Sequence, residues 1–179
     1  MSELIPVTPT NTNLLHANKF ALSFVRIPNT QYFCQGIPLP GLSMGEAIRS
    51  TQFIDLYSPG DKLLYDALAI TFLVDEDLKS WIEIHDWMRA MTFPTDFIEY
   101  ARLGKQAGPA ANKIMPQFSD AALVILDSNQ NSTYRVQFRN CYPTSLSAIQ
   151  FSSTGQGPGE AMTADATFRF DYYDIVATR

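Results

Sequence analysis

The last part of the chain, residues 162–175, alternates strictly between apolar and polar side chains. One set of alternate positions is apolar or aromatic: Ala164, Ala166, Phe168, Phe170 and Tyr172. The intervening set is polar: Thr163, Asp165, Thr167, Arg169 and Asp171. A period of two sustained over this length predicts a half-buried antiparallel strand, with one face on a core and the other on water. A chain that ends in such a strand and shows no catalytic constellation is expected to act through its surfaces.

Chain length and charge limit the classes of protein to which this sequence can belong. The 179 residues suit one domain with a sizeable core. Only 17% of them are charged, against roughly 25% in typical soluble domains. Either partners cover much of the surface, or the domain is a compact β-structure. The net charge of −5 and the scattered Lys and Arg residues argue against a surface that binds nucleic acid.

The cysteines and the amino terminus indicate a soluble protein made in a reducing cytoplasm. Cys34 and Cys141 are the only cysteines, and each stands next to an aromatic residue. Free buried thiols are therefore expected, and the spacing does not suit a zinc site. Met1–Thr12 has neither a basic start nor an apolar core, so no signal peptide is expected. No apolar run reaches membrane-spanning length.

Turn signals and hydrophobic periods divide the chain into an arm and one domain. Residues 1–18 read as a flexible arm, and 19–179 as a single mainly β domain. The expected elements are a hairpin over 20–37 turning at Pro28-Asn29, a strand at 52–56, a turn with a charged tip at 57–62, a strand at 64–74, a helix at about 77–91, a long loop at about 101–118, and strands at 121–126, 133–139, 146–151 and 162–175. The segment 141–145 is expected to break the sheet. Hairpins on both sides of one helix predict an α+β fold: an antiparallel β-barrel or sandwich with one flanking helix.

The segment around the helix carries the clearest local signals. Asp75-Glu76-Asp77 precedes apolar residues at helical spacing and favours capping of the unpaired first-turn amides over a cation site. Pro94 is expected to end the helix. Trp87 lies off the main apolar stripe and is a candidate for contact with another subunit.

Residues suited to chemistry are scarce. His85 with Glu83 or Asp86 is the only pairing suited to acid–base catalysis, and neighbours on a helix point to different faces. The glycines do not form a phosphate-binding loop. The sequence therefore predicts no enzyme, no metal site and no cofactor.

Four segments in the same order resemble a known family. They are Phe33-Cys34-Gln35 leading to Ile37-Pro38-Leu39-Pro40-Gly41, the strand-to-helix junction from Leu68 to Asp77 followed by Trp81 and Trp87, then Tyr142-Pro143-Thr144-Ser145, and last the strand from Ala166 to Tyr173. Over residues 19–176 the chain resembles the tail tube proteins of contractile-tailed bacteriophages, which are similar in fold to type VI secretion tube proteins.

The resemblance implies a structural virion protein of the phage tail. Six copies would join sheet edges into a ring, and rings would stack into a tube through which DNA passes without specific binding. Sheath and baseplate proteins are the implied partners. The predicted hairpin from Asp55 to Asp66, with Asp55, Tyr57, Asp61 and Lys62, is the candidate contact between rings. Asp165 and Asp171 are candidate channel-lining acids, with Asp127 a weaker choice.

Two alternatives to a repeating tube subunit remain open. The arm and the loop at 101–118 fit the family pattern less well, which favours a specialised ring at the baseplate end or one that completes the tail. A monomeric β-sandwich that binds a small ligand or peptide is the other alternative.

Overall fold

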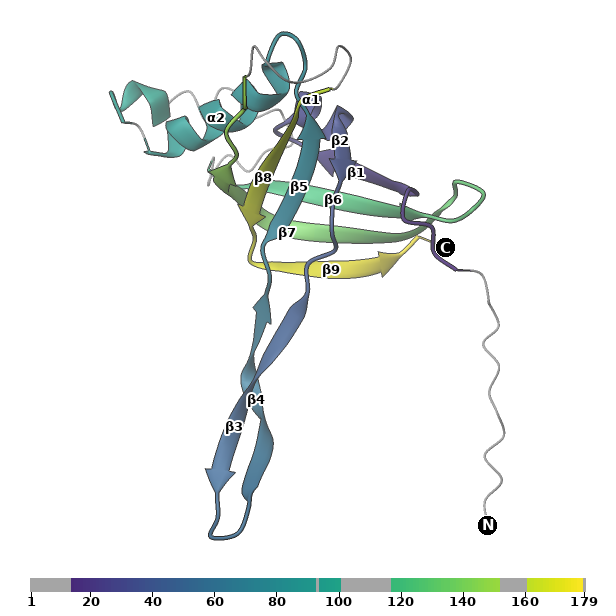
Figure 1. Ribbon diagram of the computed structural model, residues 1–179, viewed down its shortest axis with the longest axis vertical. Helices are drawn as coiled ribbons and strands as arrows, with labels where there is room; N and C mark the ends of the chain where they lie inside the picture. The colour runs from purple at the N-terminus through teal and green to yellow at the C-terminus, as the bar shows by residue number, and fades with distance from the viewer. Residues whose placement is uncertain (1–13, 93, 101–116, 152–160, 179) are drawn as a thin grey trace.

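The chain folds into a nearly closed antiparallel β-barrel with one seam, from which a long two-stranded hairpin projects (Figure 1). The computed structural model describes residues 14–92, 94–100, 117–151 and 161–178. The elements in chain order are β1 (Phe20–Phe24), α1 (Pro28–Tyr32), β2 (Cys34–Gly36), β3 (Leu42–Ser50), β4 (Asp55–Tyr65), β5 (Leu68–Leu73), α2 (Lys79–Thr92), β6 (Ser119–Leu126), β7 (Ser132–Leu146), β8 (Thr163–Arg169) and β9 (Tyr172–Ala177).

The barrel strands follow the order β1-β6-β7-β8-β5-β2, and β9 pairs with β7 beside this path. The long strand β7 joins the two halves of the barrel. Its first part pairs with β6 and β9, and its last part, from Tyr142 onward, pairs with β8. Between the two parts Asn140 adopts a left-handed conformation with φ 55°, which asparagine tolerates better than most residues. The seam lies between β1 and β2, the two ends of the strand order.

One hydrophobic core fills the barrel and extends under α2. Its buried side chains come from every long barrel strand and from one face of the helix: Leu68, Ile70, Phe72, Ala121, Leu123, Val136, Phe138, Ala164, Ala166, Phe168, Ile84, Trp87 and Ala90. Aromatic rings hold its centre, because Phe168 lies 5.1 Å from Phe24 and 6.0 Å from Trp87 between ring centroids. This cluster positions the strands whose edges and hairpin are the candidate functional surfaces.

The elements predicted from clear periodicity are confirmed. Leu68, Ile70 and Phe72 alternate inward along β5, and Ala164, Ala166 and Phe168 do so along β8. The helix expected at 77–91 is α2, and the fold class is confirmed. Most of the predicted arm at 1–18 and of the predicted loop at 101–118 lies outside the described residues.

The first predicted hairpin is wrong. β1 pairs with β6 and β2 pairs with β5, so the two strands are not partners. Pro28-Asn29 begins the short helix α1 instead of a turn, because proline suits the first helical position. Glu83 of α2 then accepts the backbone N–H groups of Asn29 and Thr30, at 3.1 and 3.2 Å.

Three predictions near the carboxyl end are also corrected. The segment 141–145 does not break the sheet: β7 continues through Pro143, because β6 has ended at the Ser119–Cys141 pair and, of the described strands, only β8 pairs with this part of β7. Residues 147–151 form no strand. The long final strand is two strands, β8 and β9, which turn at Phe170-Asp171, so Tyr172 does not continue the buried face.

Candidate assembly surfaces

The hairpin formed by β3 and β4 is the most exposed regular element of the structure. Within the part of the chain that the structure describes, its two strands pair only with each other, and every residue of β3 is exposed. An isolated two-stranded hairpin is marginally stable in water. Tyr65 anchors its base, with its ring 5.7 Å from Phe170 and 5.2 Å from Tyr173. Beyond that base, the hairpin offers both faces to partners.

A close contact between two glycines divides the hairpin into two halves. The register shifts between Met44 and Glu46, so that Gly60, Asp61 and Lys62 of β4 lie opposite Gly45 alone. A Cβ at Gly60 would lie 2.4 Å from the Gly45 carbonyl oxygen. Only glycine permits this approach, and such a bulge bends and twists the pair of strands.

The predicted charged turn at 57–62 is wrong, because these residues lie within β4. The true turn is Thr51–Ile54, which we call the tip. Thr51 closes it: its N–H donates to the Ile54 carbonyl at 3.0 Å, and its hydroxyl oxygen accepts the Ile54 N–H at 3.2 Å. Of the predicted contact residues, Asp55 adjoins the tip and Tyr57 pairs with Ile48.

The described barrel has open sheet edges. The four strands β1-β6-β7-β9 end in β1 on one side and β9 on the other, and neither has a second strand neighbour among the described residues. β9 also exposes Tyr172, Ile175 and Val176. Exposed strand edges with apolar side chains are templates for pairing with another chain.

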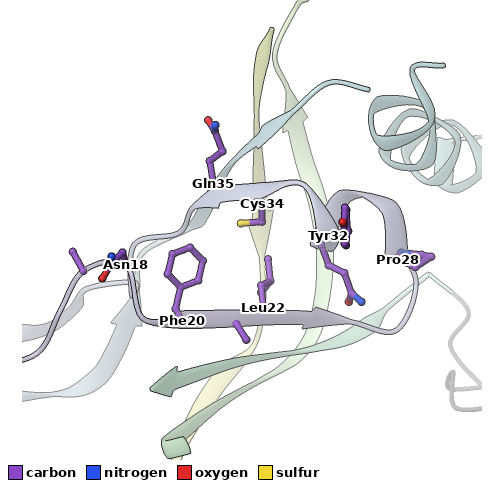
Figure 2. Close-up of a pocket in the computed structure, with 10 residues that line it drawn as sticks. Asn18, Phe20, Leu22, Pro28, Tyr32, Cys34 and Gln35 are labelled. Carbon is purple, nitrogen blue, oxygen red and sulfur yellow. The ribbon is translucent and has the colours of Figure 1, made fainter. Parts of the chain in front are cut away.

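A groove with a volume of about 760 Å³ follows the seam between β1 and β2; we call it the seam groove. Phe20 and Leu22 point from β1 toward the opposite wall, where Cys34 of β2 lies (Figure 2). Gln31 also lines the groove, and its side-chain oxygen accepts the Phe24 N–H at 2.6 Å. None of the described residues that line the groove is charged.

Trp87 does not face a partner, which corrects the prediction. Its side chain is 1% exposed, and its indole N–H donates to the Gln117 carbonyl at 3.0 Å. The guanidinium of Arg26 lies 5.2 Å from its ring centroid. The face that α2 buries, with Ser80, Ile84, Trp87 and Ala90, is rotated from the apolar stripe that the sequence spacing indicated, and Ile82 is exposed.

One of the three carboxylates before α2, Asp75, acts as expected for capping. Asp75 accepts the backbone N–H groups of Lys79 and Ser80, at 3.1 and 2.8 Å. Partial burial raises the pKa of Asp75, but the hydrogen bonds from Ser80 and Lys79 outweigh this effect and hold the pKa below its usual value. Among the described residues, no group of three or more His, Cys, Asp and Glu side chains could hold a metal ion.

The pairing of His85 with Glu83 does not form. Glu83 binds α1, whereas His85 Nδ1 lies 3.2 Å from Asp86 Oδ1 in an exposed pair. His85 also stacks on Trp81 with ring centroids 5.2 Å apart. Glu83 and His85 therefore have different partners.

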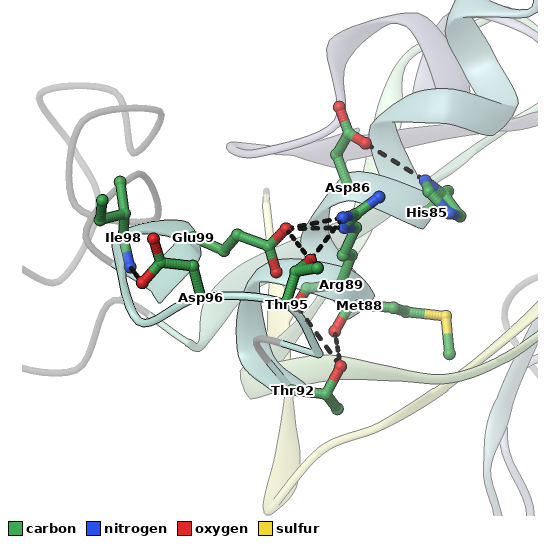
Figure 3. Close-up of polar contacts among 9 residues, drawn as sticks. All are labelled: His85, Asp86, Met88, Arg89, Thr92, Thr95, Asp96, Ile98 and Glu99. Carbon is green, nitrogen blue, oxygen red and sulfur yellow. Dashed lines mark hydrogen bonds and ion pairs between the residues drawn. The ribbon is translucent and has the colours of Figure 1, made fainter.

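A second polar cluster holds the segment that follows α2 (Figure 3). Arg89 Nε donates to Glu99 Oε1 at 2.9 Å, and Arg89 Nη2 donates to the Thr95 hydroxyl at 2.7 Å. The same hydroxyl donates to Glu99 at 2.9 Å. These bonds fold residues 94–100 back onto the end of the helix.

The candidate channel acids lie apart from one another. Asp165 is on β8 and accepts the Thr71 hydroxyl at 2.6 Å. Asp171 is in the turn after β8 and accepts the side-chain amide of Asn140. Asp127 builds the turn between β6 and β7 by accepting the N–H groups of Asn129 and Asn131.

Sequence reasoning missed the tip, the seam groove and the open edge at β9. The apolar pair Phe53-Ile54, between Arg49 and Asp55, was the available signal for the tip. The described part of the chain also contains no helix long and apolar enough to cross a membrane.

Comparison with known proteins gives one relative by sequence and several by structure. The chain is 25% identical over 170 residues to the tail tube terminator protein of Enterobacteria phage T4, covering 91% of this chain and 89% of the relative. Its fold is similar to a chain in the tube-terminating cap of the anti-feeding prophage, with a TM-score of 0.56, 13% identity, and coverage of 99% and 100%. It is also similar to a chain in the sheath/tube terminator of the extracellular contractile injection system PVC, with a TM-score of 0.56, 12% identity, and coverage of 92% and 98%.

The model of one protein family matches nearly the whole chain. Residues 8–176 match the family described as phage tail tube protein. This range includes both the barrel and the projecting hairpin. The chain therefore belongs to the phage tail tube protein family.

Proposed function

We propose that six copies of this chain form a closed ring in a phage tail, around a channel for DNA. The observation that carries the proposal is the four-stranded sheet β1-β6-β7-β9, which ends in one open edge on each side. An edge of one copy that pairs with the opposite edge of the next makes a head-to-tail contact, and such contacts close into a ring if the rotation permits. Closing the ring removes the open edges.

The projecting hairpin suits contact with a neighbouring ring. β3 has nine residues, and at about 3.3 Å per residue the hairpin reaches roughly 30 Å from its base. Asp55, Tyr57, Asp61 and Lys62 of β4 stay the proposed contact residues. Sheath and baseplate proteins are the further proposed partners in the virion.

The channel function requires a wall that does not hold DNA. The chain carries a net charge of −5, and a weakly negative wall repels phosphates. Asp165 and Asp171 stay the proposed channel acids. The proposed role is structural, without catalysis or cofactor.

A second position in the tail is favoured by the sequence relative. The T4 protein that matches over 91% of this chain is named a tail tube terminator. A terminator ring binds the tube on one side only, whereas a repeating subunit binds rings on both sides. The two positions share the ring and differ in whether the protein stacks on itself.

The deciding experiment is mass measurement and negative-stain electron microscopy of the purified protein. We expect rings with a central hole: long stacks indicate a repeating subunit, and single rings indicate a terminator or initiator. A monomer at high concentration that also fails to ring on a purified tail as template would contradict the proposal and favour a monomeric binding module. Val176→Lys, on the β9 edge, should abolish rings by opposing edge pairing, whereas Ser128→Lys in the β6–β7 turn should leave them intact.

A further inference from the structure

The four-stranded sheet β1-β6-β7-β9 has one covered face and one open face. The covered face carries Leu123, Val136 and Phe138, which belong to the core shared with β5, β8 and α2. β5 and β8 run steeply across β6 and β7 (Figure 1). Side chains alternate along a strand, so the intervening residues form the other face, which we call the open face. It includes Asp120, Ala122, Arg135, Gln137, Arg139 and Asp174, all exposed or half-buried.

The size of the proposed ring decides which of these faces lines the channel. Six copies of the sheet, joined edge to edge, make a barrel of about 24 strands with a radius of roughly 18–26 Å, depending on strand tilt. Packing β5 and β8 on the inside would take about 10 Å of that radius, and α2 would take about 10 Å more. The channel would then be too narrow for a DNA duplex. In the ring, the covered face therefore points outward and the open face lines the channel.

The open face carries as many arginines as acids. Within these four strands, the charged side chains are Asp120 on β6, Arg135 and Arg139 on β7, and Asp174 on β9. All four lie on the open face. Guanidinium groups bind phosphates readily, so six copies would present a band of arginines to DNA. A channel lined in that way would hold DNA unless other groups occupied the arginines.

Asp120 occupies one of the two arginines. Arg139 Nη1 donates to Asp120 Oδ2 at 2.7 Å, and Arg139 Nη2 donates to Gln137 Oε1 at 3.2 Å. The backbone N–H of Asn140 donates to the other oxygen of Asp120 at 3.2 Å, so both oxygens of this carboxylate are held. The side-chain amide of Asn140 donates in turn to Asp171. Asp171 therefore supports the residue that positions Asp120.

Asp174 lies beside both arginines on the neighbouring strand. The register pairs it with Gln137, which separates Arg135 from Arg139 along β7. Asp174 is thus a diagonal neighbour of each arginine, a spacing that long side chains can reach. The hydrogen bond and the charge of Asp120 raise the pKa of Arg139, and the charge of Asp174 adds to this effect. Both acids therefore act on the same guanidinium group.

We propose that Asp120 and Asp174 shield Arg135 and Arg139 of the channel wall from the phosphates of passing DNA. The inference rests on the proposed function, because the open face becomes a wall only in a ring. It names the acids that keep the wall from holding DNA. It also moves this role away from Asp165, which lies on β8, outside the four strands, and accepts the Thr71 hydroxyl.

The first test measures binding of a fluorescent DNA duplex to assembled rings by anisotropy. Wild type is compared with the double variant Asp120→Asn and Asp174→Asn, which keeps the side-chain shapes and removes the two charges. Wild-type rings should bind weakly. The variant rings should bind at least about tenfold more tightly in about 50 mM salt, with a steeper loss of affinity as salt rises. Adding Arg135→Gln and Arg139→Gln should abolish the gain.

The matched control is the double variant Glu76→Gln and Asp96→Asn. It removes two exposed carboxylates that flank α2 in the chain and none from the open face, so its rings should bind DNA as weakly as wild type. Tight binding by wild-type rings, or no gain on removing Asp120 and Asp174, would overturn the proposal. An equal gain in the control would also overturn it, because net charge alone would then explain the effect. A gain from Asp165→Asn alone would place the shielding acid on β8 instead.

The second test identifies the face that lines the channel and does not require the acid variants to form rings. In a Cys34→Ser background, Ala122→Cys places a thiol on the open face, and Glu76→Cys places one before α2. Each thiol is labelled with biotin-maleimide, and the assembled rings are mixed with streptavidin, which is too wide to enter the channel. Streptavidin should bind rings labelled at residue 76 and not those labelled at residue 122. Binding at residue 122 as strong as in the unassembled chain would overturn the wall assignment.

Failure of the ring and failure of the shielding are distinguishable. If the wild-type chain forms no ring with or without a tail template, the proposed function fails and the shielding fails with it. If rings form but streptavidin binds at residue 122, or DNA binding ignores Asp120 and Asp174, only the shielding fails. A thermal melt of the double variant that matches wild type confirms that the barrel is intact.

Discussion

The barrel and the hairpin of this chain are stabilised in opposite ways. The barrel buries its large side chains, with Phe72, Phe138 and Phe168 fully enclosed, and it carries its own core. The hairpin exposes nearly all of its residues and has no core beyond the anchor at Tyr65. The barrel is therefore stabilised by its own folding, whereas the hairpin depends on what it contacts in an assembly.

Removing the hairpin should have the largest effect on assembly and little on folding. We propose to replace residues 44–63 with Asn-Gly, which keeps the Ser43–Leu64 pair and suits a tight hairpin turn. The variant should lose rings or stacks completely while its melting temperature changes by less than about 4 °C. Electron microscopy and a thermal melt measure the two quantities.

A matched replacement in another turn is the control for the shortened hairpin. Replacing Ser128-Asn129 with Asn-Gly changes the turn between β6 and β7 and leaves the hairpin whole. This variant should assemble. If the shortened hairpin variant still forms normal particles, the hairpin is not the dependent region that the comparison describes.

Core and hairpin truncations should differ strongly in stability. Phe168→Ala removes a fully buried ring next to Phe24 and Trp87, and we expect it to lower the free energy of unfolding by about 3–5 kcal/mol. Tyr57→Ala in the hairpin should change it by less than about 0.5 kcal/mol. Urea unfolding at protein concentrations below assembly measures both. A Tyr57→Ala cost as large as a core truncation would show that the hairpin packs on the barrel.

The same difference between barrel and hairpin explains which elements could be predicted from the sequence. β5, β8 and α2 were predictable because each buries one face in the barrel core, which imposes a period of two or 3.6 on the chain. Strand partners were not predictable: β1 and β2 pair with β6 and β5, which are distant in sequence. No local signal encodes those choices.

The turn of the hairpin was predicted at the wrong residues for a specific physical reason. Pro59-Gly60 has the composition of a turn, but Gly60 serves a bulge where its backbone crosses Gly45. Bulges and turns need the same residues because both need backbone freedom. The actual turn at Thr51–Ile54 contains neither glycine nor proline and is closed by a threonine hydroxyl. An exposed hairpin also has no buried face to impose a period.

Removing the cap of α2 should lower the free energy of unfolding of the barrel by a moderate amount, without affecting the hairpin. Asp75→Ala deletes the acceptor of two first-turn N–H groups, and we expect it to cost about 1 kcal/mol. Because the pKa of Asp75 is lowered in the folded state, its stabilisation is present above the unfolded pKa near 3.9 and is lost as pH falls through the lower folded value.

The measurement is urea unfolding of wild type and Asp75→Ala from pH 7 to pH 3. The difference between the two proteins should be constant at neutral pH and shrink below about pH 4. Asp77→Ala, which removes the exposed partner of the Lys79 ammonium, is the control and should show a much smaller difference. A gap between wild type and Asp75→Ala that widens on acidification would contradict the capping role.

The smallest effect is expected in the reactivity of the two thiols. Cys141 reports on the core, and Cys34 reports on the seam groove. Burial raises the pKa of Cys141 to about 12, and it also raises the pKa of Cys34, in part offset by a backbone hydrogen bond to Gly36. Cys141 is fully buried and should not react with a maleimide in the native protein, whereas the half-buried Cys34 should react slowly. Pairing of the next copy's β9 with the β1 edge, which borders the groove, should slow the Cys34 reaction by at least about tenfold in assembled particles, since access limits the rate. Cys34→Ser should abolish native labelling, and Val176→Lys should keep Cys34 reactive at every concentration. An equal Cys34 rate in free and assembled wild-type protein would show that the groove stays open, and would contradict pairing at the β1 edge.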